Sequence, residues 1–450
     1  MRRVKPVSVI LACLALGGVL AAGQFGRGVS AETARYVIQE LASHRFAAAA
    51  ARFDGPLRAA LPEDRLAALW SSLEEQVGKF EGVRGVVVSG QSTPTFTLVC
   101  QFERADLDAV LTFNAYGQLS GLFFRQSALA KWTPPSYAQP ENFTEVPVTV
   151  KTGRWSLPGT LTVPKGNGPF PAVVLVQGSG PEDQDETVGL NKPFKDLAWG
   201  LANRSIAVLR YTKRTLRYGA ASSIDPATFT VNDEIVDDAR SAVSLLAQQP
   251  QIDSRCVFLL GHSFGATVAP RIAAGDHQIA GLVLMASAVT PIERLALDQV
   301  RAIDARQDLA PGVAQKQIAE AEAEVRRIES PGLKPGATVS FLGAEIPSSY
   351  WLDLRHYHPG SVAAALRIPI LVLQGGRDYQ VPPSEMGRWK KALASHTNAS
   401  LELFPDLNHL FEAGAGPSSP VEYLRAGHVD EKVIAAIASW IEAAPGPIGK

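Results

Sequence analysis

The stretch Cys256-Val257-Phe258-Leu259-Leu260-Gly261-His262-Ser263-Phe264-Gly265-Ala266 decides the fold of this chain. Its first five residues form a continuous apolar run, which is typical of a strand buried on both faces, and helix-forming residues begin at Ala266. Gly261 and Gly265 flank Ser263 and permit the sharp strand-to-helix turn that a nucleophilic serine occupies. We therefore expect Ser263 to lie above the edge of a parallel sheet, next to the N-terminus of a helix.

The alternation of strands and helices continues on both sides of this stretch. The other expected parallel strands are 172–176, 206–210, 281–286, 370–373 and 400–404, and the expected helices are 195–202, 232–248 and 429–441. Two further strands, 145–150 and 159–163, read as an antiparallel hairpin with Pro158-Gly159 in the turn region. This spacing predicts an α/β fold, a mostly parallel sheet with helices on both faces.

A long insertion, residues 291–367, separates two of the expected strands. It is far too long for an ordinary connection. Its first half is helical in pattern and highly charged, as in the alternating Ala and Glu of 319–324, and its second half is aromatic. We expect this segment to form a cap over the carboxyl ends of the strands.

A serine nucleophile needs a base, and the base needs an acid that fixes its tautomer. In this order of strands the base should follow the last strand, where His409 stands within 407–411. The acid should follow the preceding strand, and Asp378 ends the loop Gln374-Gly375-Gly376-Arg377-Asp378. Asp406 is the nearest competitor, but its place three residues before His409 is more typical of a turn.

The tetrahedral intermediate of acyl transfer also needs two N–H donors for its oxyanion. One should be the backbone N–H of Phe264, the residue after the nucleophile. The loop Gln177-Gly178-Ser179-Gly180-Pro181 follows the first parallel strand, and we expect Ser179 N–H to be the second donor. This glycine-rich loop lacks the Lys-Ser/Thr of a phosphate-binding loop, so it does not indicate a nucleotide site.

Four residues are candidates for the substrate pocket: Tyr211, His262, Tyr350 and Trp351. For Tyr350 and Trp351 the alternative is packing inside the cap. The basic run 210–214 could contact an anionic substrate group or pair with nearby acidic residues. His356-Tyr357-His358 has no accompanying ligand set, and neither a metal nor an organic cofactor is expected.

The N-terminal segment, residues 1–28, is predicted to be a signal peptide. Arg2, Arg3 and Lys5 precede the apolar run 7–22, and small residues follow at 21–23. The apolar run is shorter than the ~20 residues that span a bilayer. A cleaved leader predicts a periplasmic or secreted protein, while an uncleaved anchor and lipidation at Cys13 are the alternatives. The leader is also the only membrane contact that we expect.

Residues 29–132 are predicted to form a separate small α+β domain. Helical patterns at 31–51 and 61–73 precede β-rich runs at 83–88, 95–102, 109–113 and 119–124. A proline-rich linker, 133–144, then leads into the larger domain, residues 145–450. A length of 450 residues suits two or three domains.

The charge balance and the cysteines exclude several classes of protein. The 43 basic and 44 acidic residues leave a net charge of −1, which argues against a nucleic-acid binder with a broad basic face. The three cysteines form no CxxC pair, so neither a zinc ribbon nor a redox dithiol is predicted. Cys100 and Cys256 lie in apolar runs and are expected to be unpaired and buried.

These motifs resemble the α/β-hydrolase superfamily over about residues 145–445. Within it the chain is similar to a bacterial secreted group of carboxylesterase-like hydrolases, through GSGPEDQDE, NKPFKDLA, LRYTKRT, SYWLDL and LNHLF. The resemblance implies Ser263 as nucleophile, Asp378 as acid and His409 as base. It also implies a cystatin-like or nuclear-transport-factor-like N-terminal domain. Gln177 and Thr212 depart from the residues usual in the group.

The resulting hypothesis is a serine hydrolase that cleaves short- or medium-chain acyl esters through an acyl-enzyme. The partner is then a small-molecule ester, and no nucleic acid is expected. A peptidase or an acyl thioesterase would use the same residues, since the same groups serve amides and thioesters. The remaining alternative is a non-catalytic binding or scaffold protein with a relic hydrolase domain.

Overall fold

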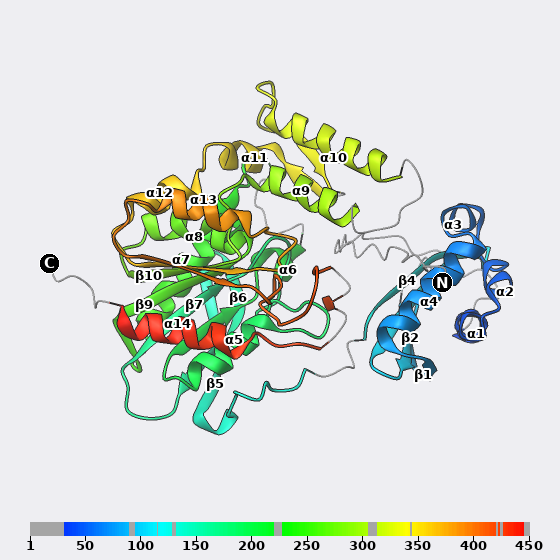
Figure 1. The fold of residues 1–450 in the computed structure, drawn as a ribbon, viewed down its shortest axis with the longest axis horizontal. Coiled ribbons are helices and arrows are strands. Elements are labelled where there is room, and N and C mark those ends of the chain that lie inside the picture. The colour runs from blue at the N-terminus through cyan, green and yellow to red at the C-terminus, as the bar shows by residue number, and fades with distance from the viewer. Residues whose placement is uncertain are drawn as a thin grey trace.

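The computed structural model describes residues 31–89, 95–114, 116–127, 132–219, 227–304, 313–342, 344–419, 422–423 and 426–444 (Figure 1). The segment predicted as a signal peptide lies outside these residues. The described strands form an eight-stranded sheet, a four-stranded sheet and a two-stranded hairpin. None of the described helices is both long enough and apolar enough to cross a lipid bilayer.

The four-stranded sheet belongs to a small N-terminal unit with its own core. Its helices are α1 (Ala31–Ala42), α2 (Phe46–Ala50), α3 (Gly55–Ala60) and α4 (Glu63–Val77), and its antiparallel strands are β1 (Phe80–Ser89), β2 (Thr95–Phe102), β3 (Asp106–Phe113) and β4 (Leu119–Gln126). Trp70 of α4 is fully buried against the rings of Phe80, Phe102 and Phe124. The helix expected over 31–51 is in fact two helices, because His44 adopts a positive φ of 55° between them.

The eight-stranded sheet has the order β14-β13-β10-β9-β7-β8-β6-β5. Its strands are β5 (Phe143–Thr152), β6 (Trp155–Pro164), β7 (Phe170–Val176), β8 (Ala207–Tyr211), β9 (Ile252–His262), β10 (Ile279–Met285), β13 (Ile370–Gly375) and β14 (Ala399–Phe404). β5 and β6 pair antiparallel, β6 pairs antiparallel with β8, and all other neighbours are parallel. The predicted mostly parallel α/β sheet is therefore confirmed.

The turn of the β5–β6 hairpin, at the edge of this sheet, lies at a different position from the one predicted from the sequence. The turn joins Thr152 to Trp155, and Pro158 and Gly159 lie inside β6, so the expected turn at Pro158-Gly159 is wrong. Gly159 serves a different purpose, because a Cβ there would overlap the carbonyl of Arg210 on β8. The glycine thus permits the close approach of two strands.

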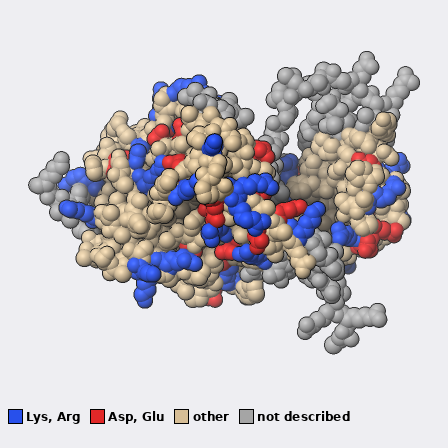
Figure 2. All heavy atoms as spheres, turned by 90° about the horizontal axis from the view of Figure 1, so that it is seen from above, with Lys and Arg blue, Asp and Glu red and all other residues tan. Residues whose placement is uncertain are grey.

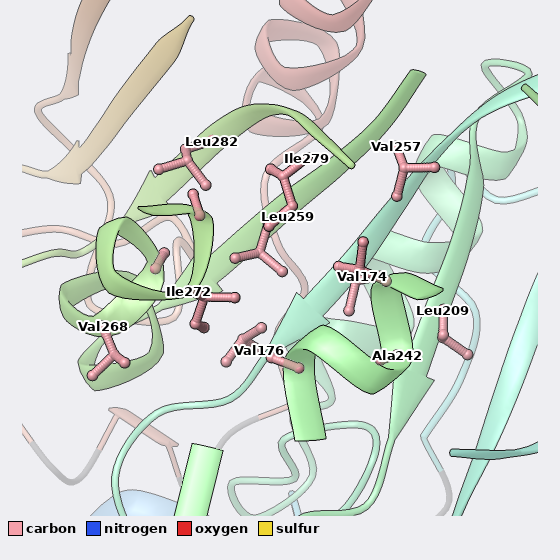
Figure 3. Packing of buried hydrophobic residues seen from close by; sticks show 14 of the residues in the cluster. Val174, Val176, Leu209, Ala242, Val257, Leu259, Val268, Ile272, Ile279 and Leu282 are labelled. Carbon is pink, nitrogen blue, oxygen red and sulfur yellow. The ribbon is translucent and has the colours of Figure 1, made fainter. Parts of the chain in front are cut away.

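Side chains from the central strands pack on both faces of the sheet. Val174 and Val176 belong to one core and Val173 and Leu175 to the other, as the alternation of a strand requires. The first core is closed by α7 (Asp237–Ala247), α8 (Phe264–Ala274) and α13 (Ser384–Ala392), and the second by α5 (Pro193–Ala202) and α14 (Glu431–Ala443). Figure 3 shows Val174, Val176 and Leu259 against α7 and α8. These two layers hold the strand ends in fixed positions.

The insertion between β10 and β13 forms the cap region. It contains α9 (Ile292–Asp304), α10 (Val313–Glu329), the hairpin of β11 (Thr338–Phe341) and β12 (Ala344–Pro347), α11 (Ser348–Arg355) and α12 (Pro359–Ala365). α9, α10, the hairpin and Trp351 of α11 share a small apolar cluster of their own. They lie above the sheet in Figure 1. α12 instead packs against α8 and joins the first core through the buried Ala363.

The surface seen from the cap side carries both signs of charge. Figure 2 shows Lys and Arg interspersed with Asp and Glu over the larger unit, with no extended basic area on that face. This distribution agrees with the nearly balanced composition.

Candidate active site

Ser263 stands on the strained turn between β9 and α8. Its φ of 55° and ψ of −120° are rare for a residue other than glycine, and it caps the N-terminus of α8. A Cβ at Gly265 would overlap the carbonyls of Val176 and Gln177, and one at Gly261 would overlap the backbone of Ala266. Both flanking glycines are thus required by close backbone contacts, as the sequence predicted.

Asp378 and His409 meet at the ends of β13 and β14. His409 Nδ1 lies 2.7 Å from Asp378 Oδ2, and both side chains are buried. The other carboxylate oxygen of Asp378 accepts the backbone N–H groups of Gln380 (2.8 Å) and Val381 (2.9 Å). The side-chain amide of Gln374 donates to Oδ2 as well, at 3.2 Å. These three donors orient the carboxylate toward the imidazole of His409.

His262 joins the serine turn to the loop that carries His409. Its Nε2 donates to the backbone carbonyl of His409 at 2.9 Å, and the two imidazole rings are 4.7 Å apart. Because Ser263 directly follows His262, this contact holds the serine beside His409. Within the described residues Ser263 Oγ and His409 Nε2 do not form a hydrogen bond, and such bonds often tighten only when substrate binds.

The loop after β7 lies directly opposite Ser263. A Cβ at Gly178 would be 3.2 Å from Ser263 Cβ and 3.6 Å from its Oγ. In the described part of the chain, neither Ser179 N–H nor Phe264 N–H donates to a protein acceptor. Both amides are therefore available to a substrate oxygen.

His262 itself is enclosed rather than open to a pocket. Its Nδ1 lies 2.9 Å from Glu186 Oε2, and Glu186 Oε1 accepts the N–H of Gly178 at 2.6 Å. Burial lowers the pKa of His262, but the Glu186 carboxylate and the His409 carbonyl outweigh it, and the pKa is raised. Glu186 thus ties the serine turn to the Gly178 loop, a role that no sequence pattern signalled.

The other three pocket candidates are also packed in the interior. Tyr211 lies in the main core, and Trp351 packs edge-to-face against Phe341 in the cap cluster. Tyr350 donates its hydroxyl to Glu234 at 2.6 Å and stacks on Phe229. All three rings are at most 8% exposed, so they pack rather than line an open surface.

The basic run 210–214 is paired with carboxylates, of which all but Glu145 are buried. Arg210 binds Asp185 and Glu145, Lys213 binds Glu234, and Arg214 binds Asp238. These side chains are therefore engaged within the protein.

An apolar cluster adjoins the Asp378–His409 pair. Tyr379 and Leu410, which follow these two residues in the chain, pack with Tyr423, and the rings of Tyr379 and Tyr423 are stacked 6.4 Å apart. Two partly buried residues flank the cluster: Val188, and Ile303 from α9 of the cap. It was not anticipated from the sequence, because its members come from five separate places in the chain.

The described surface has a hollow away from this region. A cavity of about 650 Å³ lies between the end of α8 and α12, lined by residues such as Ala273, Ile279 and Leu366. It contains neither Ser263, Asp378 nor His409. Among the described residues, no three His, Cys, Asp or Glu side chains are grouped as metal ligands would be.

The chain is similar to known proteins over most of its length. Residues 173–426 match a family described as the alpha/beta hydrolase family, and residues 34–122 match one described as a protein of unknown function (DUF3887). The chain is 38% identical to Esterase EstD of Thermotoga maritima over 427 residues, which is 94% of this chain and 97% of that protein.

The chain is also similar to solved structures at low sequence identity. Est1E from Butyrivibrio proteoclasticus is 15% identical, with a TM-score of 0.44, and the match covers 66% of this chain and 97% of that one. The acylaminoacyl peptidase of Pyrococcus horikoshii is 12% identical with a TM-score of 0.45, covering 82% of this chain and 50% of that one.

Proposed function

The chain belongs to the alpha/beta hydrolase family and is an ester-hydrolysing enzyme, and from this premise we propose that Ser263, His409 and Asp378 are its catalytic triad. The proposed substrates are small esters with short or medium acyl chains. The observation that carries the proposal is the buried 2.7 Å contact between His409 and Asp378, which lies beside the strained turn of Ser263.

The proposed reaction follows from the role that each group can fill. Ser263 Oγ attacks the ester carbonyl while His409 Nε2 takes the hydroxyl proton, and Asp378 stabilises the imidazolium that forms. The N–H groups of Ser179 and Phe264 bind the oxyanion. His409 then gives its proton to the leaving alcohol, and the acyl group stays on Ser263.

Deacylation repeats these steps with water in place of the serine. His409 accepts a proton from water, whose oxygen attacks the acyl carbonyl and forms a second oxyanion between Ser179 and Phe264. Collapse of this intermediate returns the proton to Ser263 Oγ and releases the carboxylic acid.

The pairing of nearby cations supports a small, uncharged substrate group. The apolar cluster of Tyr379, Leu410 and Tyr423 adjoins the Asp378–His409 pair, but its side chains are at most 8% exposed and pack within the protein. The pairing of the basic run with carboxylates leaves these cations unavailable to an anionic substrate.

Covalent labelling tests the proposal. A fluorophosphonate should label the wild-type protein at Ser263 with one equivalent, and Ser263→Ala should abolish both labelling and turnover of p-nitrophenyl esters. A wild-type protein that is not labelled at Ser263, or a Ser263→Ala variant with full activity, would contradict the triad.

A chain-length series tests the substrate class. Acetyl to palmitoyl p-nitrophenyl esters should give the highest kcat/KM for short or medium chains, and amide and thioester analogues should react more slowly. A preference for a peptide or thioester substrate would assign the same triad to the alternative chemistry.

We also propose that the protein is exported, as residues 1–28 suggest. N-terminal sequencing of the protein made by a bacterial host should find a start between residue 24, after the small residues 21–23, and residue 29, after the predicted signal peptide. Recovery of the uncleaved chain from the cytoplasm would contradict the proposal.

A further inference from the structure

The peptide group between Gly178 and Ser179 carries one of the two proposed oxyanion donors, and a buried lysine binds its other end. Lys213 Nζ donates to the carbonyl oxygen of Gly178 at 2.8 Å. This carbonyl and the N–H of Ser179 belong to the same planar group, in which they point in opposite directions. Fixing the carbonyl therefore fixes the direction of the Ser179 N–H.

Lys213 is held in turn by a carboxylate from a distant segment. Its Nζ lies 2.8 Å from Glu234 Oε1, and both side chains are less than a tenth exposed. Glu234 lies in the π-helical turn Asn232–Val236 that precedes α7. π-Helical turns are rare and frequently occur at functional sites.

The cap completes this arrangement. Tyr350 of α11 donates its hydroxyl to Glu234 Oε2 at 2.6 Å, so both oxygens of this carboxylate have a donor. Burial first, and then the Glu234 carboxylate, raises the pKa of Tyr350 well above its usual value, so the hydroxyl stays protonated. A continuous chain of contacts thus runs from the cap to the Gly178–Ser179 peptide.

We propose that Lys213, held by Glu234 and Tyr350, is a positioning residue that orients and polarises the Gly178–Ser179 peptide as the oxyanion donor. The inference rests on the proposed function, because it needs a tetrahedral oxyanion at Ser263. A cation bound to the carbonyl withdraws electrons from the peptide, which makes its N–H a stronger hydrogen-bond donor.

The proposal predicts a particular kinetic signature. The oxyanion exists only in the transition state and the intermediate, so loss of the Lys213 contact should lower kcat and leave KM nearly unchanged. Removal of a whole oxyanion donor costs about 10²–10³ in kcat, and Lys213 acts through such a donor, so we expect a loss of roughly 10–100-fold.

The test uses variants that leave no unpaired buried charge. Lys213→Met alone would leave Glu234 as an unpaired buried charge, and such a charge is strongly destabilising. The decisive variant is therefore the double change Lys213→Met with Glu234→Gln. Its matched control is Arg214→Met with Asp238→Asn. This neighbouring buried pair joins at 2.6 Å, and among the described residues it forms no hydrogen bond with the Gly178 loop.

The kinetics are measured per active site in the full-length protein. Fluorophosphonate titration counts the competent Ser263 sites, and kcat and KM are then measured with p-nitrophenyl butyrate. Phenylboronic acid, which forms a tetrahedral adduct with the serine, should bind the Lys213 and Glu234 double variant roughly 10–100-fold more weakly. Tyr350→Phe should lower kcat about 2–5-fold, because Lys213 keeps its carboxylate.

The outcomes separate the inference from the proposed function. A 10–100-fold lower kcat at unchanged KM, with the control pair at wild-type kcat, supports the inference. A double variant with wild-type kcat and boronate affinity overturns it, as does an equal loss in the control pair, while wild-type labelling at Ser263 leaves the proposed function standing. Absence of labelling in the wild-type protein overturns both.

Discussion

Ser263 holds a backbone conformation that costs about 1–3 kcal/mol for a residue with a side chain. The turn persists because backbone hydrogen bonds on both sides of Ser263 hold it. The N–H of Ser263 donates to Met285 O at 2.9 Å, and the carbonyl of Ser263 accepts the N–H of Thr267 at 3.0 Å. The strain therefore supports the assignment of Ser263 as a nucleophile held above the sheet.

At the same scale, Asp378→Asn should abolish most of the activity. The amide would present an N–H where His409 Nδ1 needs an acceptor, so the imidazole would take the wrong tautomer, and kcat should fall about 10⁴-fold. The measurement is kcat with p-nitrophenyl butyrate, with circular dichroism to show that the fold is kept.

Asp406→Asn is the matched control for this change. Asp406 lies three residues before His409 and is exposed, and it was the competing acid in the sequence. It should retain wild-type kcat. If Asp406→Asn lost activity and Asp378→Asn kept it, the acid would have to be reassigned.

Glu412 should make stability depend on pH. Burial raises the pKa of Glu412 to about 8 in the folded protein, against 4.5 as its ordinary value. Between these values the folded state keeps a proton that the unfolded state loses, so this group's contribution to stability falls as pH rises from 4.5 to 8. Glu412→Gln should therefore raise Tm at pH 9 but not at pH 4. At pH 9 the gain in the free energy of unfolding should be on the order of a few kcal/mol.

Thermal unfolding at the two pH values checks this expectation. Glu402→Gln, on the exposed side of β14, is the control and should shift Tm equally little at both. An identical Tm difference between Glu412→Gln and wild type at pH 4 and pH 9 would contradict the raised pKa.

At the scale of elements, the loop after β7 passes close to the nucleophile at Gly178. A Cβ at residue 178 would lie 3.1 Å from Glu186 Oε1 and 3.2 Å from Ser263 Cβ. Gly178→Ala should therefore displace the Ser179 peptide and lower kcat/KM by about 10–100-fold, as a partial loss of an oxyanion donor would. The measurement is kcat/KM together with Tm.

Gly387→Ala in α13 is the matched control for this substitution. Nothing lies within 4 Å of a Cβ at Gly387, and alanine is favoured over glycine in a helix by about 1 kcal/mol. This control should keep kcat/KM and unfold at the same or a higher temperature. Wild-type activity in Gly178→Ala would contradict this expectation and show that Glu186 and the loop move enough to admit the methyl group.

Elements were predicted best where local pattern and burial agree. The strand expected over 95–102 matches β2 (Thr95–Phe102), and the buried parallel strands lie where their apolar runs stand. The prediction of a turn at Pro158-Gly159 was wrong, because a glycine is needed at 159 for close contact with Arg210 on another strand. Such a requirement arises between strands and leaves no local signal that distinguishes it from a turn.

At the scale of the whole molecule, the two units have separate hydrophobic cores. The buried cluster of the N-terminal unit is built from described residues 34–124, and both clusters around the large sheet are built from described residues beyond 136. Across the junction, Gln126 accepts the N–H of Leu190 at 3.0 Å. Folding of the larger unit should therefore not depend on the smaller one.

Removal of the N-terminal unit should leave an active esterase. A chain of residues 132–450 keeps Trp132, which packs on Trp199 and donates to Asp196 at 3.0 Å. We expect its kcat/KM to be within about threefold of the full-length protein, since distant, independent parts contribute additively. A folded truncated protein with a more than tenfold lower kcat/KM would show that the N-terminal unit contributes to the site.

The sequence by itself determined the family, the positions of the parallel strands along the chain and the three residues proposed for catalysis. Ser263, Asp378 and His409 each follow a recognisable apolar strand, and the carboxyl ends of parallel strands meet at one edge of a sheet. Local pattern was therefore enough to predict that Asp378 lies beside His409, and the structure places them in contact.

Only the tertiary structure decided what surrounds these residues. Glu186 contacts His262, and Glu234 contacts Lys213 and Tyr350, across separations that reach 116 residues between Glu234 and Tyr350. A buried charge must find a partner, but which partner depends on how helices, loops and cap pack together. That packing placed His262 and Tyr350 inside the protein, and it connected the cap to the peptide proposed to bind the oxyanion.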